Sequence, residues 1–148
     1  MSVAVHVTVN GGRIPLARSR VAAIAAGVLR AERVRDAMLS VAFVSPREIA
    51  ALNARHLGHR GPTDVISFGF APAGRRAPVV GDIYIAPAVA RENARRHGAP
   101  VRQELARLVV HGTLHVLGHD HPEGSDRTAS PMWRRQERLL ARLLGSLA

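Results

Sequence analysis

The chain has 148 residues, of which 47% are hydrophobic, so it suits one domain with a buried core and is too apolar for intrinsic disorder. It has no cysteine, which excludes a disulfide scaffold, a thiolate zinc site and a cysteine nucleophile. Its 21 basic residues, all arginine, outnumber 11 acidic ones and give a formal net charge of +10, which favours a polyanionic partner because guanidinium groups bind phosphate bidentately.

The first predicted element is the alternating segment 3–9, which is typical of a half-buried strand and runs into a turn at residues 10–12. The segment lacks the basic region and the long apolar block of a signal peptide. No stretch of the sequence approaches the ~20 apolar residues of a membrane span. We therefore expect a cytoplasmic protein without membrane association.

The remaining sequence alternates between helical and strand patterns. Helical periodicity predicts a helix over 16–32, and Ser45 with Glu48 predicts a capping box for a helix that Gly58 ends. The other predicted strands are 38–44, 65–70 and 82–86, with a loop at 71–81; the other predicted helices are 87–97, one opened by Pro100 and stopped by Gly118, and one from Pro131 to the C-terminus. These elements, with no repeat or long linker, predict one small α+β domain over 1–148, in which a mixed sheet of about four strands packs with about five helices.

Four of the eight histidines fall within HGTLHVLGHDH, residues 111–121. His111 and His115 are one helical turn apart, so both imidazoles lie on one helix face and can bind one metal ion. Gly118 can end the helix in the left-handed conformation, after which the returning chain delivers His121. The register is that of metzincins and predicts a zincin-like helix with one zinc ion on His111, His115 and His121, and a fourth position open for catalysis.

Gly112 stands where zincins carry the glutamate that activates water. Peptide hydrolysis needs proton delivery to a poor amine leaving group, whereas a phosphodiester has a better leaving group and a charge that arginine can neutralise. Zinc alone lowers the pKa of its water to about 7. The missing glutamate therefore favours a nuclease over a protease. We expect Gly112 to leave room beside the metal for a phosphate, and its replacement by alanine to stabilise the helix.

The histidine motif is accompanied by further similarity outside it. With Leu52-Asn53, PTDVISF (62–68) and GDIYI (81–85), it resembles the YbeY family of bacterial endoribonucleases, whose C-terminal helix also fits Met132 and Glu137. The resemblance implies zinc on the three histidines and cleavage of single-stranded RNA. It further implies ribosomal RNA precursors and the ribosome as partners, in small-subunit 3′ end maturation and ribosome quality control.

One position departs from the family pattern. The family usually carries an arginine four residues after the Leu-Asn pair, and this chain has Leu57 there. Arg55 and Arg60 flank Leu57, so we expect one of them to bind the substrate phosphate, or phosphate binding to be arranged differently.

Several charged residues are further candidates. Asp120 is adjacent to a predicted ligand and is the candidate catalytic residue, because it can orient His121 through its second nitrogen; capping of the loop is the alternative. Asp64 begins a strand and either faces the site or caps a turn. Glu104 shares the helix face of the histidines and either contacts a ligand or pairs with an arginine. Arg75 and Arg76 are candidate phosphate contacts or ordinary loop residues.

Two other function classes stay open. A metzincin-like metallopeptidase is disfavoured by the missing glutamate. A non-catalytic, ribosome-associated RNA-binding module with structural zinc would need a closed site, for which His119 or Asp120 could supply a fourth ligand. His119 also competes with His121 as third ligand, and the histidines could be a metal-free cluster at a helix end. Aromatic residues make up only 3% of the chain, so RNA binding is expected to depend on charge.

Overall fold

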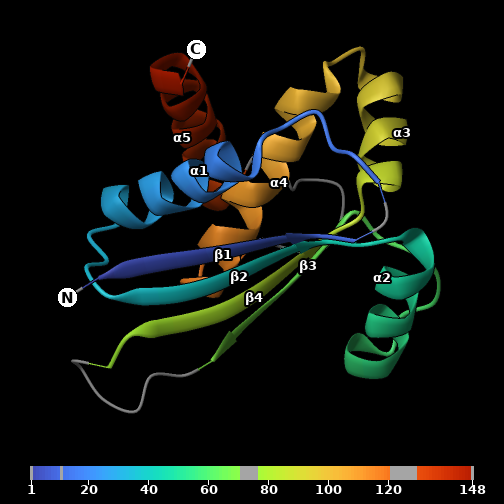
Figure 1. The fold of residues 1–148 in the computed structure, drawn as a ribbon, viewed down its shortest axis with the longest axis horizontal. Helices are drawn as coiled ribbons and strands as arrows, with labels where there is room; N and C mark the ends of the chain where they lie inside the picture. Colours follow the sequence, from blue (N-terminus) through green and yellow to red (C-terminus); the bar gives the residue numbers. More distant parts are fainter. Residues whose placement is uncertain (1, 11, 71–76, 121–129, 148) are drawn as a thin grey trace.

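A computed structural model describes residues 2–10, 12–70, 77–120 and 130–147. The described residues form one small α+β domain in which four strands make a mixed sheet with five α-helices (Figure 1). The strands are β1 (Val3–Val9), β2 (Ala37–Phe43), β3 (Val65–Phe70) and β4 (Val79–Ile85). The α-helices are α1 (Arg18–Ala31), α2 (Pro46–Leu52), α3 (Pro87–His97), α4 (Val101–Val116) and α5 (Pro131–Leu147), and a π-helical turn, η1 (Asn53–Leu57), follows α2. The predicted fold class is confirmed.

The sheet has the order β1-β2-β4-β3. β2 runs parallel to both β1 and β4, and β3 is antiparallel to β4 at the edge. The predicted start of β4 at residue 82 is wrong. β4 begins at Val79, because Val79 pairs with Ala37 of β2, and this long-range pairing overrides the local Pro and Gly signals of the preceding loop.

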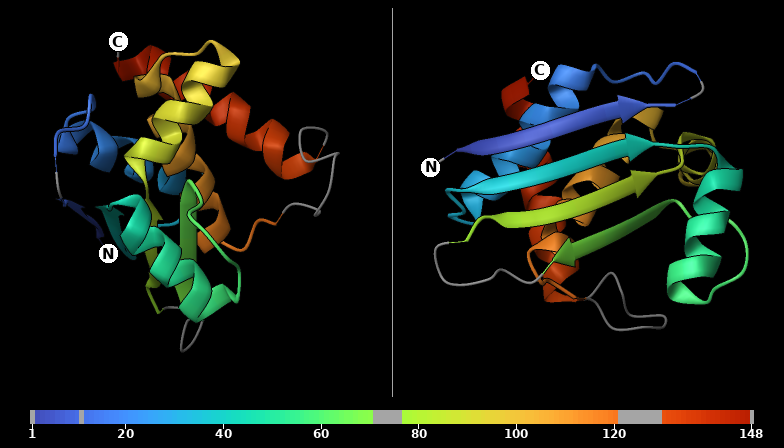
Figure 2. Two further views of the ribbon diagram at one scale, coloured as in Figure 1. Left: turned by 90° about the vertical axis from the view of Figure 1, so that its right-hand side faces the viewer. Right: turned by 60° about the horizontal axis from the view of Figure 1, so that its bottom comes forward.

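Helices α1 and α4 pack on one face of the sheet, and α5 packs on α4 on that same side (Figure 2). The main core lies beneath them and includes Val28 and Leu29 of α1, Leu105 and Leu114 of α4, and Ile83 of β4. On the opposite face, at one end of the sheet, Ile49 of α2 joins Ile66 in a smaller cluster. No helix in the described ranges has the length and apolar composition needed to cross a membrane.

Helix ends follow the local signals in the sequence. Ser45 Oγ accepts the Glu48 N–H at 3.1 Å, while Glu48 Oε1 accepts the Ser45 N–H, which completes the predicted capping box. Gly58 follows η1 in the left-handed conformation, with φ of 67°. Gly118, after α4, has φ of 96°, as the predicted helix stop requires.

The end of α4 fits into a notch in the sheet. Gly69 and Gly81 are register partners on β3 and β4, and Val116 of α4 lies directly over both. A Cβ at Gly81 would lie 2.4 Å from Val116 Cγ1, and one at Gly69 would lie 2.7 Å from the Val116 carbonyl oxygen. The glycine pair therefore lets the helix approach the sheet closely, directly beside His115.

Candidate metal centre

α4 presents His111 and His115 side by side, as their spacing predicts. Their ring centroids lie 4.7 Å apart with an interplanar angle of 74°. His111 is 9% exposed and His115 is partly buried, while apolar residues such as Leu114 bury other sides of the same helix in the core. Core packing thus fixes the backbone that carries both imidazoles.

A hydrogen bond from α5 determines which nitrogen of His111 can bind a metal. Gln136 is 1% exposed, and its Oε1 lies 2.6 Å from His111 Nδ1. The Gln136 Nε2 group donates to Glu137 Oε2 at 3.0 Å, and an ionised carboxylate can only accept, so the carbonyl side of the Gln136 amide faces the imidazole. Nδ1 of His111 therefore carries the proton and donates this hydrogen bond to Gln136, so the lone pair that can bind a metal is on Nε2.

The Gln136 amide is itself held by an ion-pair network. Arg107 donates to Glu137 Oε2 at 3.0 Å and to Glu104 Oε1 at 3.0 Å. The hydrogen bond to Glu137 makes the largest contribution to a raised pKa of Arg107, burial lowers this pKa, and the hydrogen bond to Glu104 raises it further. Glu104 thus pairs with an arginine, which was one of its two predicted roles, and the charges orient the amide that contacts His111.

A pocket of about 430 Å³ adjoins the two histidines. From the segment after α2, Leu57 and His59 line this pocket, whereas Arg55 and Arg60 are exposed residues outside its lining. Asn53, which is buried, fixes the segment: its Nδ2 donates to the Gly61 carbonyl at 3.0 Å. The predicted phosphate-binding role of the two arginines stays a prediction.

Asp64 lies where this pocket meets a second one. It lines both pockets, as His111 does, and its Oδ2 accepts a hydrogen bond from Asn93 Nδ2 at 3.2 Å. Asp64 therefore faces the site, which was one of its two predicted roles. Asp120 is exposed just beyond Gly118, and its role as catalytic residue stays a prediction.

The third ligand was predicted to be His121, which lies outside the described residues, as do Arg75 and Arg76. Within the described part of the chain, no three His, Cys, Asp or Glu side chains are grouped to hold a metal. His119, the alternative ligand, is engaged elsewhere: its Nε2 lies 2.5 Å from Glu32 Oε1 at the end of α1. Glu32 also accepts from Arg135 at 2.8 Å. Burial raises the pKa of Glu32, but the hydrogen bonds from Arg135 and His119 outweigh it and leave the pKa lowered.

The expectation that Gly112 leaves room for a phosphate is wrong. Gly112 is buried and faces the sheet, and a Cβ there would lie 2.7 Å from Ile83 Cγ2. Because His111 and Gly112 are adjacent on a helix, their side-chain directions diverge, and the histidine faces the pocket while Gly112 faces β4. Close packing on Ile83 accounts for the glycine.

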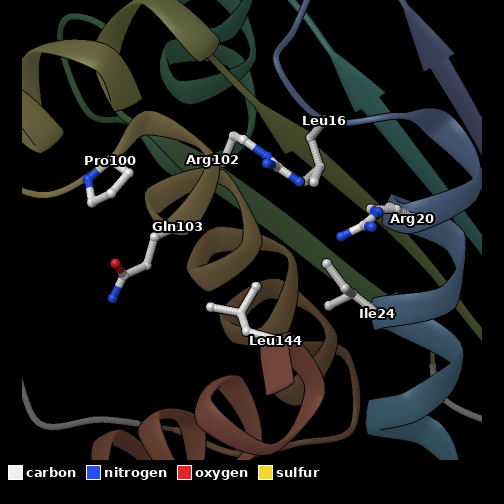
Figure 3. Close-up of a pocket in the computed structure, with 7 residues that line it drawn as sticks. All are labelled: Leu16, Arg20, Ile24, Pro100, Arg102, Gln103 and Leu144. Carbon is white, nitrogen blue, oxygen red and sulfur yellow. The ribbon is translucent and has the colours of Figure 1, made fainter. Parts of the chain in front are cut away.

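A further pocket of about 270 Å³ lies away from the histidines, between α1, the start of α4 and the end of α5. Arg20 and Arg102 extend into it from two helices over an apolar floor that includes Ile24 and Leu144 (Figure 3). None of its lining residues is a candidate ligand, so it is separate from the site.

Gln136 and His59 are site residues that sequence reasoning missed. Gln136 had a signal, because it occupies an apolar position in the buried stripe of α5, between Met132 and Leu139. A glutamine at such a position needs a buried partner. For His59 the sequence contains no such signal beyond its nearness to Leu57, because its position depends on the fold of the loop.

Proteins similar to this chain are known in sequence and in structure. The family model Endoribonuclease YbeY matches residues 10–144. Among relatives with that name, one from Frankia casuarinae is 37% identical over 94% of this chain and 74% of its own. One from Geobacillus kaustophilus is 40% identical over 75% of this chain and 76% of its own. The solution structure of TM1509 from Thermotoga maritima superposes with a TM-score of 0.64 and 25% identity, covering 97% of this chain and 91% of that one. The chain, with its paired histidines on α4 beside a pocket, therefore belongs to the YbeY family.

Proposed function

We propose that this protein is a zinc-dependent endoribonuclease that cleaves single-stranded RNA. The observation that carries the proposal is the pair His111 and His115, held at the wall of a pocket in a chain of the YbeY family. The relatives' name, Endoribonuclease YbeY, supports the reaction class. The +10 charge supports a polyanionic substrate.

The side chains fit a zinc ion in donor type. His111 and His115 offer two imidazoles on one helix face, and the Gln136 contact at Nδ1 makes Nε2 the metal-binding nitrogen of His111. His121 would complete the set of three. A zinc ion bound there supplies Lewis-acid chemistry to a phosphodiester.

The protein's own groups would bind and position the RNA. Arg55 and Arg60 are exposed on the segment that lines the pocket, which suits contacts to phosphates flanking the scissile bond. Asp120, next to His121 in sequence, would accept a hydrogen bond from that imidazole and fix its tautomer. With few aromatic residues, most of the binding energy would come from the RNA backbone, so sequence preference would be weak.

For the biological substrate, we propose ribosomal RNA precursors and the ribosome, with a role in small-subunit 3′ end maturation and ribosome quality control in the cytoplasm. This step extends the family resemblance and the basic charge to a structured RNA partner.

The test uses the purified full chain, end-labelled single-stranded and double-stranded RNA, and casein. We expect cleavage of single-stranded RNA only, lost with a chelator and restored by zinc, and RNA affinity that falls steeply as salt rises. His111→Ala, His115→Ala and His121→Ala should each lose stoichiometric zinc and cleavage. The matched variant His119→Ala, whose imidazole contacts Glu32, should retain both.

Two results would overturn the proposal. Casein digestion without RNA cleavage would establish a peptidase. RNA binding without cleavage at any metal loading would establish a binding module. Loss of zinc in His119→Ala with retention in His121→Ala would show that the third ligand is assigned wrongly.

A further inference from the structure

The second pocket that contains His111 has a volume of about 630 Å³, within the ~300–1,000 Å³ typical of small-molecule sites. It lies between α3, α4 and α5. From α4 it is lined by Glu104, Arg107, Leu108 and His111, which recur at helical spacing along one stripe. His115 lies one turn further along that stripe, in the first pocket. The two pockets therefore adjoin, with His111 between them.

The charges in this pocket disfavour a phosphate. Arg107 is the one arginine among its described lining residues, and both Glu104 and Glu137 already accept hydrogen bonds from it. Asp64 adds a carboxylate to the wall. In a chain with a net charge of +10, this pocket lacks a cationic surplus, so an uncharged ligand fits it better than an anionic one.

From α5 the pocket is lined by Gln136 and by Trp133, which is partly buried and is the only tryptophan of the chain. Its place on α5 is fixed at the helix start, where its backbone N–H donates to Ser130 Oγ at 3.1 Å. Trp133 also borders a hollow lined by Arg134, Glu137, Arg138 and Ala141, in which both arginines are exposed and Glu137 already accepts hydrogen bonds from Arg107. An aromatic ring beside exposed arginines is the combination with which proteins bind single-stranded nucleic acid, by stacking a base and neutralising the backbone.

We infer that this pocket is a nucleobase subsite, in which one base of the RNA strand stacks on Trp133 while its phosphate lies toward the histidines. The inference rests on the proposed function for the identity of the ligand. A base is joined to its phosphate through one ribose, so the base belongs to a nucleotide flanking the scissile bond. Stacking tolerates every base, so the subsite adds affinity with little sequence preference.

The direct test is fluorescence of the full chain titrated with adenosine, because Trp133 is its only tryptophan. We expect saturable quenching that is the same with zinc and with EDTA, since the ligand contacts the ring and not the metal. Ribose 5-phosphate and inorganic phosphate should not quench. Two-dimensional NMR of the wild-type protein should show the single indole N–H signal shifting with the same midpoint.

A matched pair of substitutions separates this pocket from general effects. Ala99 lines the pocket and Ala88 is exposed on α3 outside it, so Ala99→Phe should fill the pocket while Ala88→Phe should not. In Ala99→Phe we expect no quenching by adenosine and a KM for single-stranded RNA raised about tenfold, with kcat retained. A tenfold change corresponds to ~1.4 kcal/mol and lies within the range for stacking one base. Ala88→Phe should match the wild type.

The outcomes distinguish this inference from the proposed function. Quenching that does not saturate, or that persists in folded Ala99→Phe, overturns the subsite. If Ala99→Phe does not fold, an indole signal unmoved by adenosine in the wild type overturns it equally. Saturable quenching in a protein that cleaves no RNA would support the nucleobase subsite and overturn the proposed nuclease activity instead.

Discussion

The two sides of α4 differ in the interactions that they make: one packs against the sheet and the other forms hydrogen bonds beside the pocket. On the sheet side, Val109, Gly112 and Val116 are buried. Gly112 and Val116 lie so close to the strands that one additional methyl group at either contact would clash. On the pocket side, Arg107 and His111 take part in a chain of hydrogen bonds that depends on which group donates and which accepts. The sheet side is restricted by side-chain volume and the pocket side by the pattern of donors and acceptors. Substitutions on the sheet side should therefore lower the stability of the fold, and substitutions on the pocket side should weaken metal binding.

The largest expected effect is that of Gly112→Glu. The carboxylate would be forced against Ile83 in the core, at a cost of roughly 3 to 5 kcal/mol from overpacking and burial of an unpaired charge. We expect loss of cooperative thermal unfolding, measured by circular dichroism, rather than a folded protein that has lost only cleavage. A folded, zinc-binding Gly112→Glu protein would show that this side of α4 is not closed.

Gly112→Ala measures the same contact more gently. The new methyl group would lie 2.7 Å from Ile83 Cγ2, so we expect destabilisation of about 1–3 kcal/mol instead of the gain that alanine gives in a free helix. Gly145 on α5 is the matched control, because a Cβ there meets nothing within 4 Å, and Gly145→Ala should be neutral or stabilise by up to ~1 kcal/mol. In a double-mutant cycle, Ile83→Ala should relieve part of the cost of Gly112→Ala. Strict additivity would mean that the two side chains do not clash.

The pocket side is tested by Gln136→Leu, which keeps the volume and removes the acceptor for His111 Nδ1. We expect zinc affinity to fall about 10–100-fold, measured by competition with a chromophoric chelator, because loss of such a partner frees the tautomer and orientation of the ligand. Gln136→Glu, which can still accept, should lose less. In the metal-free protein, NMR should show His111 protonated at Nδ1 in the wild type and a mixture of tautomers in Gln136→Leu.

A suitable control is Gln103→Leu, because Gln103 lines the separate pocket of Figure 3. It should leave the zinc affinity unchanged. Equal affinities in Gln136→Leu and the wild type would show that the contact with Gln136 is irrelevant to metal binding.

The smallest effect is expected from the anchor that holds α5 beside α4. Glu32→Gln weakens the contacts to Arg135 and His119 and should lower the free energy of unfolding by about 1–2 kcal/mol at neutral pH. Because the pKa of Glu32 is lowered in the folded state, its contribution is present above the ordinary value near 4.3 and is lost as pH falls through the folded value. The free energies of unfolding of the two proteins should therefore converge as the pH falls below the ordinary pKa of a glutamate. The control is Glu92→Gln, at an exposed pair with Arg95, which should not measurably change the free energy of unfolding. If the difference in stability between the wild type and Glu32→Gln were the same at every pH, the pH dependence would not come from the Glu32 carboxylate.

Sequence signals were sufficient where structure is local. The capping box at Ser45, the glycines that end α4 and the π-helical turn, and the four-residue spacing of the histidines all lie within one or two helical turns. They failed where partners are distant. The start of β4 depends on pairing with β2. The need for glycine at position 112 depends on contact with Ile83 of β4, which the sequence pattern of the helix does not reveal.

The site shows the same division. His111 and His115 are found from their spacing, but the residue that orients His111 lies 25 positions away on another helix. The departure from the family pattern at Leu57 predicts Arg55 or Arg60 as a phosphate contact, whereas between residues 55 and 60 the pocket is lined by Leu57 and His59. Only the folded loop, fixed by Asn53, determines which of its side chains turn inward.

The notch formed by Gly69 and Gly81 beneath Val116 has a mechanical consequence for the neighbouring His115. A helix whose side chain is seated between two strands cannot slide along its axis or roll without a clash, so the positions of the histidines are set before any ligand arrives. Ligand binding then requires little reorganisation of α4, and the entropy lost on binding is correspondingly small. The backbone NMR chemical shifts of α4 residues other than His111 and His115 should accordingly change little when zinc is added.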